Sequence, residues 1–128
     1  MPLIRQKLKI VRSDIQTNRE WLFLFGDNYS RSGRGGQAAE MRGEPNSVGI
    51  LTKMLPSMLP EAFLRDEDFW CWKNRAQADF NRVEGHLRIG GTSIMSDKGL
   101  GTGLAQLEER APLIWAALQE EIKKWTAL

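Results

Sequence analysis

The sequence Trp21-Leu22-Phe23-Leu24-Phe25 is followed directly by Gly26-Asp27-Asn28 and then by Arg31-Ser32-Gly33-Arg34-Gly35-Gly36. The first run is apolar at every position, which is typical of a central strand that is covered on both faces of its sheet. The chain then becomes polar and rich in glycine before the helix-favouring residues Gln37 to Arg42. This order of strand, glycine loop and helix is the pattern from which we predict the fold.

Further strands and helices alternate on either side of this stretch. We predict strands within residues 8–11, 46–53 and 86–95, and helices over residues 66–82 (ending at Gly85) and 107–125. Strands that alternate with helices indicate an α/β fold with a sheet that is at least partly parallel. A chain of 128 residues is long enough for one ordinary domain, so we expect a single domain over residues 1–128.

A second glycine loop follows the last predicted strand, with the sequence Ser96-Asp97-Lys98-Gly99-Leu100-Gly101-Thr102-Gly103. Both loops begin at the carboxyl end of a strand and lead towards a helix, where backbone N–H groups can bind phosphate. Two such loops are able to hold a diphosphate from both sides. Neither loop has the Gly-Lys-Ser/Thr of the ATP-binding loop or the spacing of the dinucleotide motif. The alternative is that the glycines only form tight turns.

Three polar residues near the strand ends have two interpretations each. Asp27 and Asn28 directly follow the apolar strand, where their side chains would point into a cleft, but both residue types also favour turns. Asp14 either caps a local turn before Ile15 or accepts a hydrogen bond from an adenine amino group, with Ile15 against the base. His86 is interpreted as an ordinary strand residue. The sequence has too few ligands for a zinc site, and no metal or other cofactor is expected.

The composition favours a soluble cytoplasmic protein. The formal net charge of +2, from 18 basic and 16 acidic side chains, is too small an excess for a dedicated nucleic-acid binder. Cys71 is the only cysteine, and we interpret the segment Trp70 to Trp72 around it as buried, so a reducing compartment is the simpler expectation. No apolar run reaches the roughly 20 residues that span a bilayer, so no membrane association is expected.

Taken together, these motifs resemble the macrodomain superfamily, whose members bind ADP-ribose, from about Leu8 to Leu118. Ile10 to Ile15 looks like the early strand of the family with its adenine-binding Asp-Ile pair, although Ser13 stands where the family usually has glycine. Phe25 to Asn28 resembles the strand end that carries the asparagine for the distal ribose. Gly33 to Ala38 looks like the first phosphate loop and the start of the following helix.

The second loop and the last helix point to one branch of the superfamily. Gly99 to Leu104 and Ala111 to Ile114 are most similar to the branch that contains terminal ADP-ribose protein glycohydrolase. That branch has an aspartate just after its Gly-x-Gly-Leu, where this sequence has Ala105. No lysine is assigned as a nucleophile, although Arg42 or Lys53 could lie near the site.

The stretches 25–28, 35–38 and 41–46 also look like a set of uncharacterised bacterial and phage proteins, a resemblance that implies no activity.

The macrodomain resemblance implies a three-layer α/β/α fold in which helices flank a mixed sheet. It implies that the partner is ADP-ribose or a related NAD-derived nucleotide, free or attached to an ADP-ribosylated macromolecule. Asp14 and Ile15 would hold adenine, Asn28 would contact the distal ribose, and Asp27 would be the general base if the protein hydrolyses an ADP-ribose derivative. The loop residues expected to bind the diphosphate are Gly33, Gly35, Gly36, Gly99, Gly101, Thr102, Gly103 and Leu104.

Two other functions are compatible with the sequence. The first is a Rossmann-like nucleoside-phosphate glycosidase, suggested by Gly99 to Gly103 with Glu108 or Glu109 soon after. The second is a non-enzymatic interaction or regulatory module of phage or bacterial origin, in which the glycine loops are purely structural. Detection of a released base would favour the first alternative, and absence of any nucleotide binding would favour the second.

Overall fold

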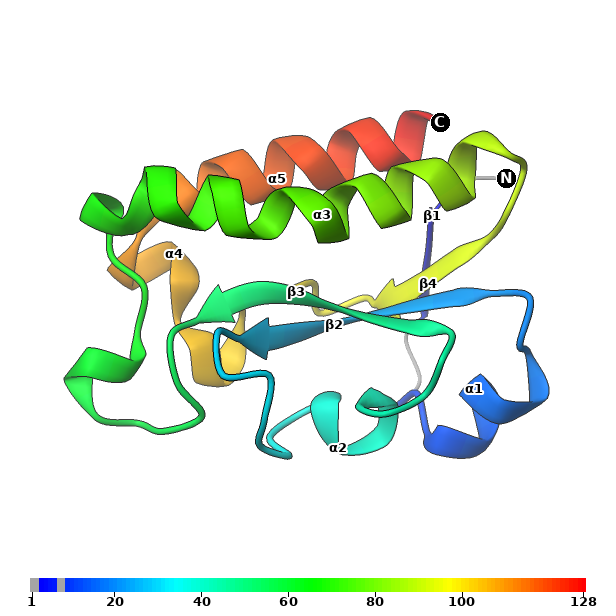
Figure 1. Ribbon diagram of the computed structural model, residues 1–128, viewed down its shortest axis with the longest axis horizontal. Helices are drawn as coiled ribbons and strands as arrows, with labels where there is room; N and C mark the ends of the chain where they lie inside the picture. Colours follow the sequence, from blue (N-terminus) through cyan, green and yellow to red (C-terminus); the bar gives the residue numbers. More distant parts are fainter. Residues whose placement is uncertain (1–2, 7–8) are drawn as a thin grey trace.

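The core of the structure is a parallel sheet of four strands in the order β1-β4-β2-β3 (Figure 1). A computed structural model describes residues 3–6 and 9–128 of the chain. The strands are β1 (Leu3–Gln6), β2 (Leu22–Asn28), β3 (Ser47–Lys53) and β4 (Ser93–Ser96). All neighbouring pairs of these strands run parallel, so the sheet differs from the mixed sheet that the family resemblance implies. Each connection between consecutive strands carries a helix, as parallel strands require.

Helices cover both faces of the sheet (Figure 1). One face carries α3 (Phe69–Arg88) and α5 (Pro112–Ala127), and the other carries α1 (Arg12–Thr17) and α2 (Ala38–Met41). The remaining helical segments are short, namely α4 (Leu107–Arg110) and the 3-10 turns η1 (Pro60–Ala62), η2 (Asp66–Asp68) and η3 (Gly103–Ala105). The α/β architecture predicted from the sequence is confirmed.

The central strand β2 separates two hydrophobic cores. Leu22 and Leu24 belong to the larger core beneath α3 and α5, whereas Phe23 and Phe25 belong to the smaller core beneath α1 and α2. Successive side chains of a strand point to opposite faces, so a strand that is covered on both faces must be apolar at every position. This arrangement confirms the predicted strand from Leu22 to Phe25, leaves Trp21 just before it and extends the strand to Asn28.

The amino-terminal elements differ from the prediction. We expected a strand over residues 8–11 and a polar loop at Ser13 and Asp14, but the strand is Leu3–Gln6 and Arg12–Thr17 is helical. Leu8 lies outside the described residues. The reason for the helix is local, because the Asp14 carboxylate accepts a hydrogen bond from the Val11 N–H at 2.9 Å and so caps the first turn.

The long helix α3 continues past its predicted end at Gly85. Its buried face comprises Trp72, Ala76, Phe80, Val83 and Leu87, so the packing of Leu87 extends the helix to Arg88. The cost of about 1 kcal/mol for one helical glycine is too small to stop it. The strand predicted over residues 86–95 is therefore wrong in its first half, and β4 begins only at Ser93. His86 is helical, with Nε2 at 2.9 Å from the Thr92 carbonyl oxygen.

The predicted carboxyl-terminal helix is divided in two. A break at Ala111 separates α4 from α5, and Pro112 begins α5, a position at which proline costs no hydrogen bond. Ile114, Leu118, Ile122 and Trp125 form the buried face of α5, as their spacing predicts. Within the part of the chain that the structure describes, no helix is both long and apolar enough to cross a membrane.

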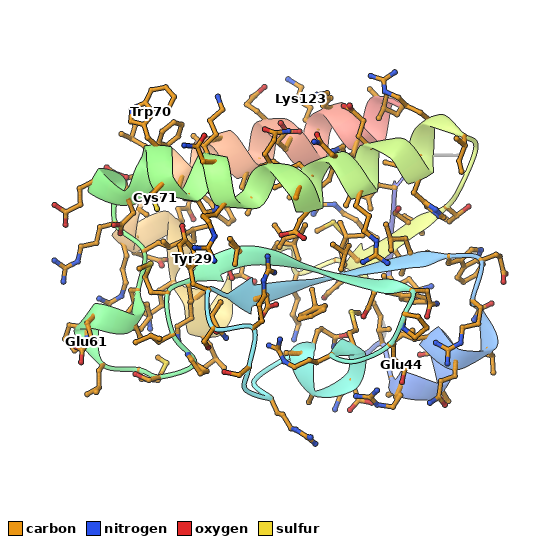
Figure 2. All side chains as sticks on the ribbon, in the orientation of Figure 1. Tyr29, Glu44, Glu61, Trp70, Cys71 and Lys123 are labelled. Carbon is orange, nitrogen blue, oxygen red and sulfur yellow. The ribbon has the colours of Figure 1, made fainter. Side chains whose placement is uncertain are left out.

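The segment around Cys71 is not buried as a whole. Trp70 is 72% exposed and Cys71 is exposed (Figure 2), whereas Trp72 is buried in the larger core. Our interpretation of a buried aromatic segment is therefore wrong for Trp70 and Cys71. Neither residue belongs to the buried face of α3, because only every third or fourth residue of this helix faces the core, and Cys71 lies on the side of the helix towards Tyr29 (Figure 2).

Candidate functional site

A cleft lies at the carboxyl ends of β2, β3 and β4. Its volume is about 770 Å³, within the range of small-molecule sites. We call residues 29–37 the first glycine loop and residues 97–103 the second glycine loop, and each of these segments supplies six of the residues that line the cleft. The cleft brings together every predicted site residue except Asp14 and Ile15, namely Asp27, Asn28, Gly33, Gly35, Gly36, Gly99, Gly101, Thr102, Gly103 and Leu104.

Residues of both loops that line this cleft have backbone N–H groups without a partner among the described residues. The N–H groups of residues 33–37 and 100–102 donate no hydrogen bond to any described residue. Positive φ angles of 93° at Gly33, 57° at Gly36 and 82° at Gly101 turn the backbone in a way that L side chains rarely permit. Successive N–H groups in such turns form concave sites that bind anions.

The loops approach each other closely across the cleft. A Cβ atom added at Gly35 would lie 3.1 Å from Cδ1 of Leu104, and one added at Gly26 would lie 4.0 Å from the Gly101 nitrogen. Gly35 itself has no positive φ and is exposed. A larger side chain at Gly35 would therefore narrow the cleft without forcing a strained backbone.

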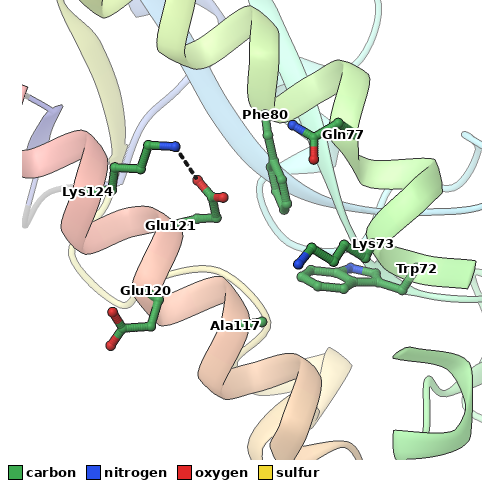
Figure 3. Close-up of a pocket in the computed structure, with 8 residues that line it drawn as sticks. All are labelled: Trp72, Lys73, Gln77, Phe80, Ala117, Glu120, Glu121 and Lys124. Carbon is green, nitrogen blue, oxygen red and sulfur yellow. Dashed lines mark ion pairs between the residues drawn. The ribbon is translucent and has the colours of Figure 1, made fainter. Parts of the chain in front are cut away.

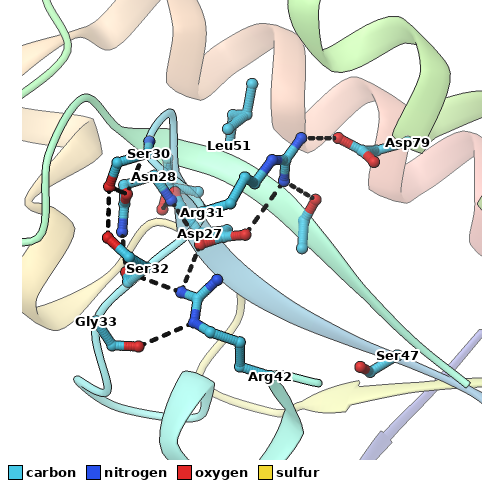
Figure 4. Close-up of polar contacts among 12 residues, drawn as sticks. Asp27, Asn28, Ser30, Arg31, Ser32, Gly33, Arg42, Ser47, Leu51 and Asp79 are labelled. Carbon is cyan, nitrogen blue, oxygen red and sulfur yellow. Dashed lines mark hydrogen bonds and ion pairs between the residues drawn. The ribbon is translucent and has the colours of Figure 1, made fainter. Parts of the chain in front are cut away.

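Asp27 is the centre of a polar network that holds the first glycine loop (Figure 4). Its Oδ1 accepts hydrogen bonds from Arg42 Nη2 at 2.6 Å and from the Asn28 N–H at 2.8 Å, and its Oδ2 pairs with Arg31 Nη1 at 3.2 Å. The Asp27 side chain is only 3% exposed. Both oxygens are thus engaged within the protein, and the carboxylate is placed to position the loop rather than to act as a free base.

The two arginines connect Asp27 to the rest of the molecule. Arg42 Nε donates to the Gly33 carbonyl at 2.9 Å, and Arg31 donates to the Gly49 carbonyl at 2.9 Å and to Asp79 of α3 at 2.6 Å. Burial opposes the charge of Arg31, but its bonds to Asp79 and Asp27 raise its pKa above the ordinary value. The first glycine loop is therefore tied to α3 and β3 by charged groups.

Asn28 is also occupied within the loop. Its Oδ1 accepts from the Ser30 N–H at 3.0 Å, and its Nδ2 donates to the Ser32 carbonyl at 2.7 Å (Figure 4). This pattern is that of an asparagine that stabilises a turn. For Asp27 and Asn28 the geometry thus favours the structural interpretation over a direct role in chemistry.

Asp14 and Ile15 lie away from the cleft. Ile15 is fully buried in the smaller core, and the Asp14 carboxylate caps α1, so neither residue lines the cleft. Their expected contact with adenine is not supported by this placement. Glu44 fixes the same region, because it accepts hydrogen bonds from Arg12 and from Arg19, which hold the pKa of Glu44 below its usual value. Glu44, within the stretch 41–46, therefore holds α1 and the residues after it in place through these two arginines.

Lys53 lines the cleft, whereas the sequence indicated only that it could lie near the site. It ends β3, and its Nζ donates to the Ser57 carbonyl and lies 4.7 Å from the ring centre of Phe63. Arg110 stacks on the same ring at 3.7 Å. Burial and then the nearby charge of Arg110 lower the pKa of Lys53. The sequence could indicate that Lys53 lies near the cleft, because it ends a predicted strand. It could not indicate the contacts with Phe63 and Arg110, because neither residue is close to Lys53 in sequence.

A second, smaller hollow lies between α3 and α5 (Figure 3). Its volume is about 350 Å³, and it is lined by side chains of mixed charge together with the aromatic rings of Trp72 and Phe80. No glycine loop or strand end reaches it. Glu108 and Glu109, the carboxylates of the glycosidase alternative, are exposed on α4 and line neither this hollow nor the cleft.

Comparison with characterised proteins and with solved structures finds no match to this chain. One family model does match, and it covers residues 5–121, which include both glycine loops, α1, α2, α3 and the first ten residues of α5. Its description is a family of unknown function. Because the match extends over nearly the whole chain, the protein belongs to the family DUF7831.

Proposed function

We propose that this protein binds ADP-ribose or a closely related NAD-derived nucleotide in the cleft between the two glycine loops. The observation that carries the proposal is the set of N–H groups at residues 33–37 and 100–102, which have no partner among the described residues and belong to two segments that line one cleft. A diphosphate has oxygens at both ends of its bridge and can accept from both loops at once. A single phosphate would need only one of them.

The fold supports the proposal in a general way. Ligands of parallel α/β sheets bind outside the carboxyl ends of the strands, which is where this cleft lies. Helices on both faces of the sheet are compatible with a macrodomain-type arrangement, which we include in the proposal. A volume of about 770 Å³ leaves room for the sugars and base beside the diphosphate.

Arg42 adds a charged donor to the two loops. It lines the cleft, and its Nε and Nη2 are used by Gly33, Ser32 and Asp27, whereas its Nη1 donates to no described residue. An arginine held in this way is preorganised, so less conformational entropy is lost when it binds phosphate. Adenine recognition by Asp14 and Ile15 is left out of the proposal because neither lines the cleft.

Turnover of an ADP-ribose derivative is a separate part of the proposal, and Lys53 is its candidate residue. An amine whose pKa is lowered is uncharged more of the time. The uncharged Lys53 amine can form a C–N bond to the anomeric carbon while the bond from that carbon to the attached group breaks, and water then cleaves the C–N bond and releases ADP-ribose. Asp27 serves to position the first glycine loop. Hydrolysis of an ADP-ribosylated substrate by the wild type, lost in Lys53→Ala and kept in Lys123→Ala, would support this part.

Binding is tested by calorimetry and by thermal unfolding with ADP-ribose. A ligand that binds only the folded state adds about 2.7 kcal/mol of stability at 100 times its Kd, so the midpoint should rise clearly. Gly35→Val should weaken binding at least about tenfold because its side chain enters the cleft beside Leu104. Gly85→Ala is the matched control, since a Cβ at this exposed helical glycine meets no atom within 4 Å.

The wild type and Gly85→Ala should bind alike. Unchanged unfolding at millimolar ADP-ribose, or equal affinity in a folded Gly35→Val protein, would contradict the proposal. Binding of no nucleotide of any kind would favour the alternative of an interaction module. The glycosidase alternative is less well supported because Glu108 and Glu109 do not line the cleft.

A further inference from the structure

The cleft concentrates positive charge beyond what a diphosphate requires. Its lining holds five basic residues and one acidic residue, a net charge of +4, whereas the whole chain carries only +2. The basic residues are Lys9, Arg34, Arg42, Lys53 and Lys98, and the acidic one is Asp27. A diphosphate bridge in a nucleotide contributes about two negative charges, so it leaves part of this excess unbalanced.

Most of the excess charge is not neutralised within the protein. Arg42 is paired with Asp27, and Lys53 donates to a carbonyl oxygen. Lys9, Arg34 and Lys98 form no ion pair with any described residue. The acidic neighbour Asp97 is exposed and does not line the cleft.

The two lysines among these residues, Lys9 and Lys98, lie in the segments that follow two neighbouring strands. Lys98 follows β4, Lys9 follows β1, and β1 and β4 are adjacent in the sheet. A hydrogen bond of 3.0 Å from the Asp97 N–H to the Gln6 carbonyl ties the second glycine loop to the end of β1. Ser96, the last residue of β4, also lines the cleft, and its Oγ accepts from the Lys98 N–H at 3.2 Å, so its own hydroxyl hydrogen is available to a ligand.

The opposite end of the cleft has a different character. Beyond β3 the lining consists of Lys53 and the segment 56–58, which includes the exposed Met58. A strongly charged group would gain less there, because Lys53, the one cation that lines that end among the described residues, is partly buried and already donates to the Ser57 carbonyl. An additional anionic group therefore fits the β4 end better than the β3 end.

We propose that the preferred ligand carries a phosphomonoester in addition to its diphosphate, and that Lys98, Lys9 and Ser96 bind this third phosphate. The inference rests on the proposed function and narrows its ligand class to phosphorylated forms of ADP-ribose. A phosphomonoester carries about −1.5 to −2 charges at pH 7 and accepts up to three strong hydrogen bonds, which suits two lysines and a hydroxyl.

The test compares three probes by calorimetry: ADP-ribose, ADP-ribose 2′-phosphate and ADP-ribose 1″-phosphate. The first phosphorylated probe places its extra group on the adenosine ribose, and the second places it on the distal ribose, so the pair identifies the source of the third phosphate. At least one of them should bind about tenfold more tightly than ADP-ribose. The gain should fall as salt is raised, because the lysines are exposed.

The lysines are tested by Lys98→Gln and by the double variant Lys9→Gln with Lys98→Gln. The quantity compared is the affinity for the tighter-binding phosphorylated probe divided by the affinity for ADP-ribose. This ratio should fall to about one in the double variant, whereas Lys123→Gln, on the outer side of α5, should leave it unchanged (Figure 2). All variants replace exposed side chains, and their unfolding midpoints serve as the check of folding.

Three outcomes would overturn the inference. Equal or weaker binding of both phosphorylated probes would show that the lysines are merely solvated, and ADP-ribose binding would then still support the proposed function. A gain that survives in the double variant would remove Lys9 and Lys98 from the site. Failure of all three probes to bind would contradict the proposed function as well.

Discussion

The two glycine loops face the same cleft but are held by different interactions. The first glycine loop is fixed by charged groups, with Asp27 between Arg31 and Arg42 and a further bond from Arg31 to Asp79. The second glycine loop has no ion pair among the described residues and is followed by buried apolar side chains. The comparison shows that one set of donors depends on electrostatics and the other on packing and backbone conformation.

The second glycine loop owes its shape to glycine and to apolar contacts. Leu100 is buried, and Gly101 lies against the Leu107 side chain. The Leu107 N–H also donates a hydrogen bond of 2.9 Å to the Gly101 carbonyl. Positive φ angles at Gly99, Gly101 and Gly103 make the turns. Salt and pH should therefore affect the first loop far more than the second, which the following variants test.

The largest effect is expected from Asp27→Asn. The amide would direct an N–H group at Arg31 and would leave both guanidinium groups without their shared anion. We expect a loss of roughly 2 to 4 kcal/mol in the free energy of unfolding, below the range for fully buried pairs because both arginines reach solvent. Urea unfolding measures this loss. Asp79→Asn is the control, since Asp79 contacts only Arg31 of the two arginines and its removal should cost less.

The same measurement at about 1 M NaCl, where the Debye length is about 3 Å, should reduce the cost of Asp27→Asn. A cost below about 1 kcal/mol at low salt would show that the network does not stabilise the first glycine loop.

The second prediction concerns Gly101→Ala in the second glycine loop. Its φ of 82° is strained for alanine, and the added Cβ would lie 2.8 Å from Cδ2 of Leu107. We expect a loss of roughly 1 to 3 kcal/mol that does not depend on salt. Gly103→Ala is the matched control, because its φ of 58° is also positive but its Cβ would meet no atom within 4 Å. Equal costs for the two variants would mean that contact with Leu107 contributes nothing.

A smaller effect is expected from Glu44→Gln, which extends the charged side of the comparison to α1. Hydrogen bonds from Arg19 and Arg12 lower the pKa of Glu44 in the folded state. Its contribution to stability is therefore present above the ordinary pKa of glutamate and is lost as the pH falls through the lowered folded value. Urea midpoints measured from neutral to acidic pH should decline less in Glu44→Gln than in the wild type. Parallel declines would contradict this role of Glu44.

The sequence predicted those parts of the fold that depend on local pattern. The alternation of Leu22, Phe23, Leu24 and Phe25 between two cores is a direct consequence of strand geometry, and glycine clusters at strand ends mark both loops. The helix α1 was missed because six residues are too few to display a helical period, and its cap at Asp14 also fits a turn. The end of α3 was missed because tertiary packing of Leu87 outweighed the preference of Gly85.

The sequence predicted where the candidate site lies but not which residues contact one another in it. Strand ends and glycines located the cleft, since parallel strands bring their carboxyl ends to one edge. The partners of Asp27 are Arg31 and Arg42, and which of the many arginines would reach it depends on how the loop folds back over β3. The same holds for Lys9 and Lys98, which are distant in sequence but both line the cleft because β1 pairs with β4.

The smallest expected effect is that of Arg110→Gln on the reactivity of Lys53, which lies at the β3 end of the cleft, outside both loops. Burial lowers the pKa of Lys53, and the charge of Arg110 lowers it further, so removal of that charge should raise the pKa while burial keeps it below the ordinary value. The measurement is the pH profile of reductive alkylation at Lys53, followed by mass spectrometry with Lys123 as internal reference. The Lys53 profile should move to higher pH in Arg110→Gln. Arg110→Lys keeps a charge near Phe63 and should leave the profile closer to that of the wild type. A profile that does not move, or that moves equally in both variants, would show that the charge of Arg110 does not tune this amine.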